Sequence, residues 1–144
     1  VEEKKMIEDL FREINTNTGK GSYGLQEVIE FLKNNVVKTL LITDNTNLHR
    51  VEALCKRCKH IQEDIVERPL VIPKKTEYKN NPCPECKAMD KEVNEQDIVE
   101  YLQIIAAKTG SQLEVISGSA EHGNMLASLG KVGAILRYNP GHSK

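Results

Sequence analysis

Apolar residues recur every three to four positions in four stretches of the chain, a spacing that predicts four amphipathic helices. These stretches cover approximately residues 2–14, 25–32, 95–109 and 122–129. Asn94 is placed to cap the third helix, with Asp97 at its third position, and Gly110 is expected to end it. Asn35 follows the second helix, where we expect the left-handed conformation that glycine usually provides.

Other segments are rich in β-branched and apolar residues and predict strands. The longest, Val36–Ile42, is almost continuously apolar, which is typical of a strand covered by helices on both faces. Shorter strands are predicted at Arg50–Leu54, Leu113–Ile116 and Ala134–Tyr138, and a weaker β-like segment at Arg68–Ile72. Because strand and helix alternate towards the end of the chain, we expect an α/β fold, an α-β-α sandwich with a mixed, partly parallel sheet.

The composition changes between Cys55 and about Lys91, where Lys, Glu, Pro and Asn replace most of the apolar residues. We therefore divide the chain into a core domain, residues 1–54 and 92–144, and an inserted minidomain, residues 55–91. The insert is too poor in apolar residues to fold alone. A bound metal is expected to supply most of its stability.

All four cysteines fall within this insert, as the pairs Cys55-x-x-Cys58 and Cys83-x-x-Cys86. Two such turns brought together make a closed tetrahedral site of four sulfurs, which predicts one structural zinc ion. Basic residues beside both pairs favour thiolates, whereas cysteines of an ordinary core would have apolar neighbours.

The alternatives to zinc are iron held by the same ligands, two disulfides, or cysteines that stay reduced in an apolar core. His60 lies close enough to Cys58 to be a reserve ligand.

Free thiols fit a reducing compartment, and the sequence has neither a membrane-spanning apolar run nor a signal-peptide pattern. We therefore expect a cytoplasmic protein. Since the chain begins at Val1 inside a charged helical pattern, we interpret it as a domain of a longer one.

The formal net charge of −1 gives no general attraction for nucleic acid. Residues 55–91 carry nine Lys and Arg against six Asp and Glu. Four thiolates and a zinc ion would add a charge of about −2 and leave this region only weakly basic. An RNA- or ribosome-binding zinc ribbon is therefore an alternative function, resting on Lys56, Arg57, Lys59, Lys74, Lys75 and Lys79.

Two patterns suggest chemistry, and the context of each argues against it. Residues 19–24 match Gly-x-Gly-x-x-Gly, the pattern of a dinucleotide-binding loop. Such a loop follows a strand, whereas the element predicted before residue 19 is a helix. His122 beside Glu121 could be a general base, yet no nucleophile is identifiable with it. A closed four-sulfur site also leaves no open coordination position. We expect neither an enzyme nor a small-molecule substrate.

The glycine-rich segment near the C-terminus suggests a partner-binding surface instead. Gly130 and Gly133 allow a helix end to turn closely into the last strand, and Arg137 and Tyr138 emerge at the end of that strand. Arg and Tyr often anchor protein interfaces. Together with Val132, these residues form the candidate partner-binding set.

Three segments together resemble the C-terminal domain of the class-one peptide chain release factors of archaea and eukaryotes, over nearly the whole chain. They are the ending Leu129–Tyr138, the turn Thr18–Gly24 and the strand Val36–Ile42. The two cysteine pairs match the minidomain of the archaeal members. The chain departs from the glycines that the family favours at Asn35, His122 and Lys131.

The resemblance implies a role in translation termination. In this family an N-terminal domain reads the stop codon and a Gly-Gly-Gln tripeptide of the middle domain promotes peptidyl-tRNA hydrolysis, and this sequence contains neither. The resemblance implies instead a non-catalytic adaptor domain that binds a translational GTPase similar to elongation factor one alpha, and later an ABC-type ribosome recycling ATPase. The full-length protein would reach the ribosome. A domain of the related ribosome-rescue factor Pelota is the other alternative.

Overall fold

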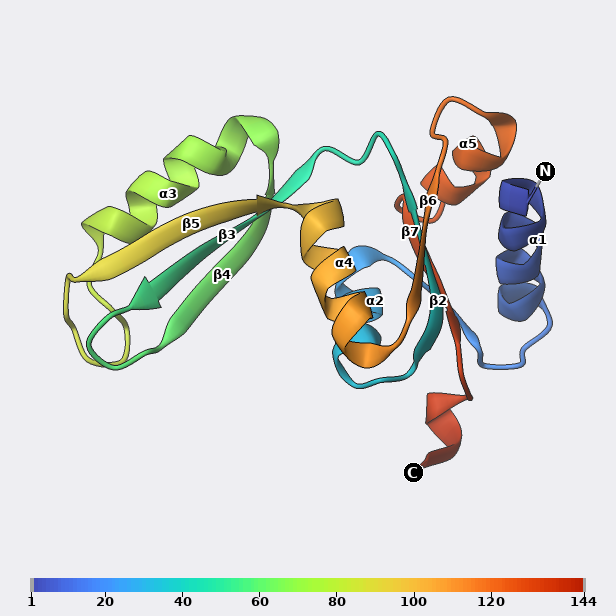
Figure 1. The fold of residues 1–144 in the computed structure, drawn as a ribbon, viewed down its shortest axis with the longest axis horizontal. Coiled ribbons are helices and arrows are strands. Elements are labelled where there is room, and N and C mark those ends of the chain that lie inside the picture. The colour runs from blue at the N-terminus through green and yellow to red at the C-terminus, as the bar shows by residue number, and fades with distance from the viewer. Residues whose placement is uncertain (1, 144) are drawn as a thin grey trace. The chain divides into compact units, whose positions relative to one another are not determined.

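The computed structural model describes residues 2–143 of the 144-residue chain. The described residues form two compact units. The first consists of the chain up to Thr46 together with the chain from Leu102 onward, and the second consists of Asn47–Tyr101. Each unit is built around a sheet of its own (Figure 1).

The first unit has a four-stranded sheet in the order β1-β7-β2-β6. The central strand β2 (Val37–Thr43) pairs in parallel with β6 (Gln112–Ile116) and antiparallel with β7 (Val132–Leu136). β1 (Gly21–Tyr23) pairs antiparallel with the other edge of β7. The mixed, partly parallel sheet predicted from the sequence is confirmed.

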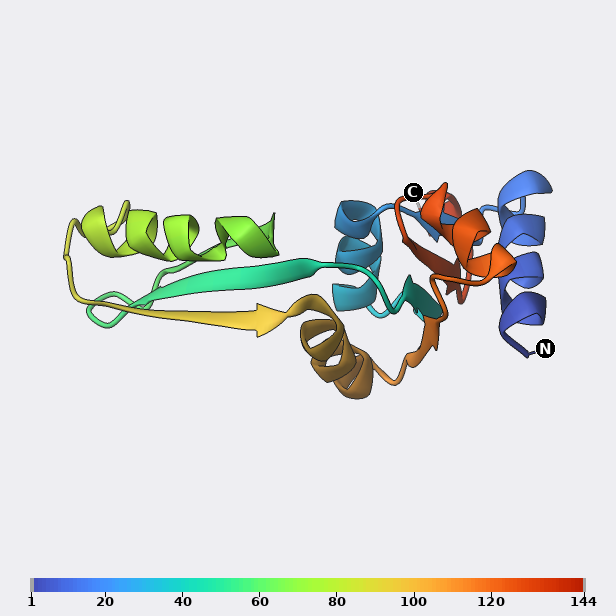
Figure 2. The same cartoon turned by 90° about the horizontal axis from the view of Figure 1, so that it is seen from above.

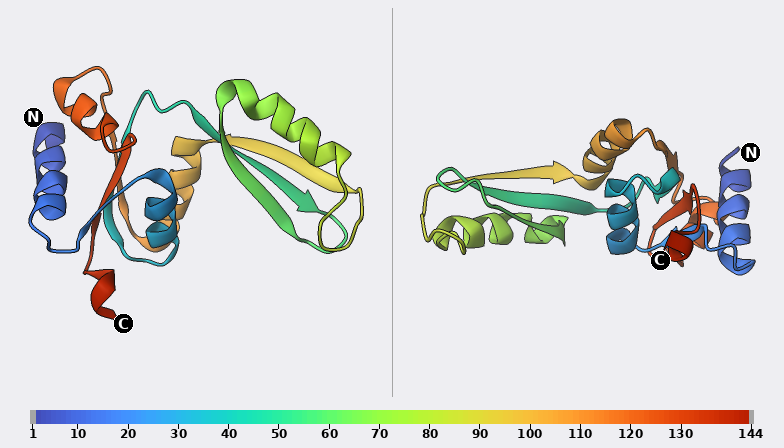
Figure 3. Two further views of the ribbon diagram at one scale, coloured as in Figure 1. Left: turned by 180° about the vertical axis from the view of Figure 1, so that it is seen from behind. Right: turned by 90° about the horizontal axis from the view of Figure 1, so that it is seen from below.

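Helices cover both faces of this sheet (Figures 1 and 3). α1 (Glu2–Asn15) packs against α5 (Glu121–Ala127) on one face. The other face carries α2 (Leu25–Lys33) and the part of α4 (Ile98–Thr109) that belongs to this unit. Asn35 has a φ of 64° just after α2, so it adopts the left-handed conformation expected of it.

β2 is covered from both sides, which explains its nearly continuous apolar sequence. Leu41 is fully buried in a cluster with Ile7 of α1 and Leu126 of α5. Leu40 and Ile42 are equally buried, and they point to the opposite face because side chains alternate along a strand. Full burial of one such side chain contributes about 1.5–3 kcal/mol. β2 is therefore the centre of the core of the first unit.

The glycine-rich segment before α2 contains the edge strand β1, which the sequence did not predict. Gly21 passes so close to α1 that an added Cβ would lie 2.6 Å from Cγ1 of Ile14. Gly24 caps the N-terminus of α2 with a φ of 89°, a conformation that favours glycine. The Gly-x-Gly-x-x-Gly pattern therefore serves the path of the chain from α1 to α2.

The second unit is a three-stranded antiparallel sheet with one helix. β3 (Leu48–Cys55) lies between β4 (Ile61–Glu67) and β5 (Lys91–Asp97) and pairs with both along nearly its whole length. A 3-10 turn (Arg68–Leu70) leads into α3 (Val71–Asn80). Figure 2 shows α3 running along one face of these strands.

This unit extends beyond the predicted minidomain of residues 55–91 on both sides, since β3 and β5 belong to it. It also has a small apolar core, in which Val51 and Ala53 of β3 pack against Val71 and Tyr78 of α3. The composition of residues 55–91 did not indicate this core, because Val51 and Ala53 lie on β3, before residue 55.

Two local predictions in this unit are wrong. Arg68–Ile72 is not a strand but the 3-10 turn and the start of α3, because Pro69 lies in the first positions of that turn, where a helix needs no backbone N–H. Asn94 does not cap a helix, since β5 continues to Asp97. The Asp97 carboxylate caps α4 instead, accepting a hydrogen bond from the Val99 N–H at 2.9 Å.

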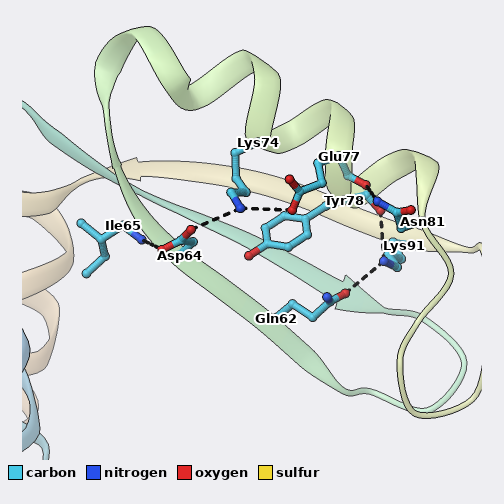
Figure 4. Close-up of polar contacts among 8 residues, drawn as sticks. All are labelled: Gln62, Asp64, Ile65, Lys74, Glu77, Tyr78, Asn81 and Lys91. Atoms are coloured by element: carbon cyan, nitrogen blue, oxygen red, sulfur yellow. Dashed lines mark hydrogen bonds and ion pairs between the residues drawn. The ribbon is translucent and has the colours of Figure 1, made fainter.

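Long polar side chains join α3 to the sheet (Figure 4). Nζ of Lys74 lies 3.2 Å from the Asp64 carboxylate of β4. Lys91 of β5 donates hydrogen bonds to Oε1 of Gln62 and to the backbone oxygen of Tyr78, both at 3.0 Å. These contacts supplement the small apolar core and help to hold β4 and β5 on either side of β3, although few residues of these two strands are apolar.

Candidate metal centre

The two Cys-x-x-Cys segments fold into matching turns. In the first turn the Lys59 N–H donates to the backbone oxygen of Cys55 at 2.9 Å, and in the second the Lys87 N–H donates to that of Cys83 at 2.8 Å. Lys59 and Lys87 each follow the second cysteine of their pair, and their φ angles are 68° and 66°. Both turns therefore close in the same way, with a left-handed residue in the same position.

Strand pairing brings the two turns together. The first turn follows β3 directly, and the second lies in the connection from α3 to β5. The β3–β5 pairing extends to Cys55 opposite Lys91, and beyond it the Lys56 N–H donates to the Asp90 oxygen at 2.9 Å. The antiparallel register therefore fixes where the cysteine pairs meet.

The four cysteine sulfurs converge on one point and all lie within 4.8 Å of one another. Sγ of Cys55 is 3.5 Å from that of Cys86, and Sγ of Cys58 is 3.6 Å from that of Cys83. A tetrahedral site with metal–sulfur bonds of about 2.3 Å separates its sulfurs by about 3.8 Å, whereas a disulfide bond measures about 2.05 Å. The four thiols are free, and their arrangement fits one four-coordinate metal ion.

The turns also change how readily the thiols ionise. The Cys58 N–H points at the Cys55 sulfur from 3.5 Å and lowers the pKa of Cys55 to about 6. Burial raises the pKa of Cys83, but the Cys86 N–H helps to outweigh it and the pKa is lowered. For Cys58 the backbone of His60 favours the thiolate, yet burial and the neighbouring sulfurs raise the pKa to about 12. Ionisation of all four thiols therefore calls for a cation between them.

His60, the predicted reserve ligand, is not part of the four-sulfur cluster that forms among the described residues. Its Nδ1 lies 3.9 Å from Oε1 of Glu85. Cys55 and Cys83 are buried, Cys86 is half-buried and Cys58 is exposed. The candidate metal centre is thus an all-sulfur set reached from solvent on the Cys58 side.

The candidate partner-binding residues do not form one surface. Val132 is fully buried, and Gly133 is buried so tightly that an added Cβ would lie 2.5 Å from Cδ2 of Leu10. Gly130 is exposed at one end of β7, and Arg137 and Tyr138 are exposed at the other end. Val132 and Gly133 are therefore part of the core, whereas Gly130, Arg137 and Tyr138 are accessible from solvent.

Arg137 also stabilises the fold of the first unit through hydrogen bonds to the backbone. Its Nε donates to the backbone oxygen of Val37 at 3.1 Å, and its Nη2 donates to that of Thr109 at 2.9 Å. A cation at the last residue of α4 also suits the helix dipole. Arg137 thereby ties the end of α4 to the start of β2.

Arg137→Ala is expected to lower the free energy of unfolding by about 1–3 kcal/mol, because it removes two charge-assisted hydrogen bonds. Urea denaturation followed by circular dichroism measures this loss. Tyr138→Ala, which shortens the exposed neighbouring side chain, is the control and is expected to change stability by about 0.5 kcal/mol or less. Equal effects of the two changes would contradict the structural assignment of Arg137.

His122, considered above as a general base, links two helices. Its Nε2 lies 2.8 Å from Oε1 of Glu3, which also accepts a hydrogen bond from the Ser117 N–H at 3.3 Å. The contact with His122 lowers the pKa of Glu3. The imidazole is thus held by a carboxylate of α1 and ties α1 to α5.

Within residues 2–143, no helix is both long and apolar enough to cross a membrane.

Comparison with known proteins places the chain in a family. The family model described as eRF1 domain 3 matches residues 1–140. Peptide chain release factor subunit 1 of Methanocaldococcus jannaschii is 31% identical over 140 residues, which cover 96% of this chain and 33% of that relative. The solved C-terminal domain of peptide chain release factor from Methanosarcina mazei matches with a TM-score of 0.80 and 27% identity, over 96% of this chain and 83% of that one.

The chain therefore belongs to the eRF1 domain 3 family. Within that family it is similar to the C-terminal domain of archaeal peptide chain release factor subunit 1, which confirms the resemblance noted in the sequence. It spans about a third, 33%, of the length of this curated relative. A chain in the structure of ribosome-bound archaeal Pelota and ABCE1 shares the fold, with a TM-score of 0.51 and 23% identity over 95% of this chain and 26% of that one.

Proposed function

We propose that this chain is the C-terminal adaptor domain of a cytoplasmic translation termination factor. The whole protein would direct release of the nascent peptide at stop codons. This domain would bind a translational GTPase similar to elongation factor one alpha, and later an ABC-type ribosome recycling ATPase, without a catalytic site of its own. The observation that carries the proposal is the match of the eRF1 domain 3 family model to residues 1–140.

We further propose that Cys55, Cys58, Cys83 and Cys86 hold one structural zinc ion. The support is the all-sulfur donor set, the matching turns and the spacing of the sulfurs, within 4.8 Å of one another. Soft thiolates prefer zinc or iron–sulfur chemistry to hard cations, and four protein ligands leave no open position. Zinc would supply charge neutralisation and a cross-link between β3 and the α3–β5 connection. The zinc ion would have no catalytic role.

For the GTPase we propose a docking surface centred on Tyr138, with Arg137 beside it. Gly130, which is exposed at the other end of β7, would make a separate contact. Tyr138 is 48% exposed although it is a large aromatic residue, and Tyr and Arg are the residue types that most often anchor interfaces. Val132 and Gly133 would hold the backbone of β7 in place beneath this surface.

Tyr138→Ala is expected to weaken binding of the GTPase by about 10-fold or more, the effect of removing an aromatic anchor. Isothermal titration calorimetry of the 144-residue chain against the GTPase measures the affinity. Tyr23→Ala is the matched control, because Tyr23 is 51% exposed on β1. Undiminished affinity of Tyr138→Ala would remove this residue from the interface, and the absence of binding by the unaltered chain would contradict the proposed function itself.

The RNA-binding alternative has less support, because half of its basic residues are paired. Lys56 lies 3.9 Å from the Asp90 carboxylate, Lys74 lies 3.2 Å from Asp64, and Lys75 lies 3.7 Å from Glu95. RNA binding through this region requires an affinity that falls steeply with salt and is lost on charge reversal at Arg57, Lys59 and Lys79.

A further inference from the structure

The sheet of the second unit has one face under α3 and one face that no described element of that unit covers (Figure 2). Residues paired across strands share a face, so the register identifies the residues of the uncovered one. We call it the open sheet face. Its central part consists of Arg50, Glu52 and Leu54 of β3, Ile61, Glu63 and Ile65 of β4, and Glu92, Asn94 and Gln96 of β5.

The open sheet face has an excess of negative charge. Arg50 is the one cation among these nine residues, and its guanidinium donates hydrogen bonds to the carboxylates of Glu63 and Glu52. Burial opposes the charge on Arg50, but these two carboxylates raise its pKa. Glu92 adds a further carboxylate, and Glu100 lines a depression of about 350 Å³ together with Arg50 and Glu52. The positive charge of Arg50 is thus used within the face. Oε1 of Glu92 accepts a hydrogen bond from the Asn94 side-chain amide at 3.2 Å, a neutral donor that leaves the negative charge of Glu92 uncompensated for a partner.

Apolar side chains accompany these charges. Ile61 is 49% exposed, and its cross-strand partner Leu54 is half-buried, as is Ile65. The aromatic ring of Tyr101 closes the other end of the face, with the Arg50 guanidinium 4.6 Å from the ring centroid. A sheet face that exposes aliphatic side chains between carboxylates is suited to an amphiphilic partner.

We propose that the open sheet face binds a Lys- and Arg-rich protein segment that also carries aliphatic side chains. Cationic side chains complement the carboxylates, and the aliphatic ones cover Ile61 and Leu54. RNA is disfavoured here because its phosphates would meet like charge. This surface belongs to the second unit and contains none of the residues proposed for the GTPase, so the inference does not rest on GTPase binding.

The test uses the whole zinc-loaded chain, labelled with ¹⁵N, and three probes of equal length: a lysine–leucine peptide, a glutamate–leucine peptide and a single-stranded RNA. The lysine–leucine peptide is expected to shift the amide signals of β3, β4 and β5, with an affinity that falls as salt is added. Glu92→Lys and Ile61→Ser are each expected to weaken its binding by about 3- to 10-fold.

Two matched variants control for charge and apolar surface in general. Glu30→Lys alters an exposed carboxylate of α2, and Ile72→Ser alters a 75% exposed isoleucine of α3 on the covered side of the same sheet. Both are expected to bind the lysine–leucine peptide as the unaltered chain does. The proposal is wrong if that peptide does not bind, if the controls weaken binding as much as Glu92→Lys and Ile61→Ser, or if the glutamate–leucine peptide or the RNA shifts the same amides. GTPase affinity is expected to be unchanged in Glu92→Lys, which separates this outcome from a failure of the proposed function.

Discussion

Cys83→Ala is expected to abolish tight metal binding and to open the cysteine end of the second unit. Structural zinc contributes about 10–16 kcal/mol of apparent binding free energy in small zinc domains, so its loss exceeds any other local change. Native-state hydrogen exchange is expected to show lost protection at both turns and at the adjoining end of β3. Protection around Val51, which packs against α3, is expected to fall less, and the first unit is expected to be unaffected.

Ala88→Ser is the control for this experiment, because Ala88 lies in the same turn and contributes no metal ligand. Mass spectrometry under native conditions is expected to find one zinc per chain in the unaltered protein and in Ala88→Ser, and none in Cys83→Ala. Iron in place of zinc would contradict the metal assignment. If the amides of the two turns stayed fully protected from exchange in the metal-free protein, the metal would not be what stabilises these turns, and the proposed structural role of the metal would be contradicted.

Gly123→Ala is expected to destabilise the first unit strongly. A Cβ on Gly123 would lie 1.9 Å from the backbone oxygen of Ser117 and 2.9 Å from Cα of Gly118. Neither atom belongs to a flexible side chain, so α5 or the preceding loop must move. We expect a loss of about 3 kcal/mol or more in the free energy of unfolding, measured by urea denaturation.

Asn124→Ala is the matched control for Gly123→Ala. Asn124 is the next residue of α5, is exposed, and gains helix propensity on this change. Its stability is expected to stay within about 0.5 kcal/mol of the unaltered chain. If Gly123→Ala lowers the free energy of unfolding no more than this control does, α5 does not approach the loop at Ser117 as closely as described.

The sequence predicted best those elements whose apolar residues face a large core. α1 has one apolar face, of which Ile7 and Leu10 are fully buried, and the centre of β2, Leu40–Ile42, is continuously apolar because helices cover both of its faces. The cysteine turns were also predictable, since the spacing within each pair is local and the two pairs need each other to fill a tetrahedral site.

The strand Arg50–Leu54 was predicted and corresponds to β3, but β4, α3 and β5 of the second unit escaped prediction because they bury few apolar residues each. β5 has one, Val93, and β4 alternates between an open face and a face joined to α3 by polar contacts such as Lys74 with Asp64. α3 buries only Val71 and Tyr78, too few to give a helical period. Tertiary pairing with β3, which no local pattern reveals, decides these structures.

The sequence did not distinguish the buried from the exposed residues of the candidate partner-binding set. The glycine-rich ending correctly predicted close packing. A sequence alone, however, does not show whether the close neighbour of a glycine is a partner protein or a side chain of the same core. Gly133 is of the second kind, because Leu10 fills the space beside it. Arg137 is both exposed and bonded to Val37 and Thr109, which makes Tyr138 the cleaner probe of binding.

A competition assay tests the central claim, that this chain is an adaptor for the termination GTPase, most directly. In a reconstituted archaeal translation system, an excess of the zinc-loaded chain is expected to sequester the GTPase and slow stop-codon-dependent peptide release by the full-length factor. Tyr138→Ala is expected to inhibit much less, and added GTPase is expected to restore the rate. An unchanged release rate at saturating concentrations of the chain would contradict the account.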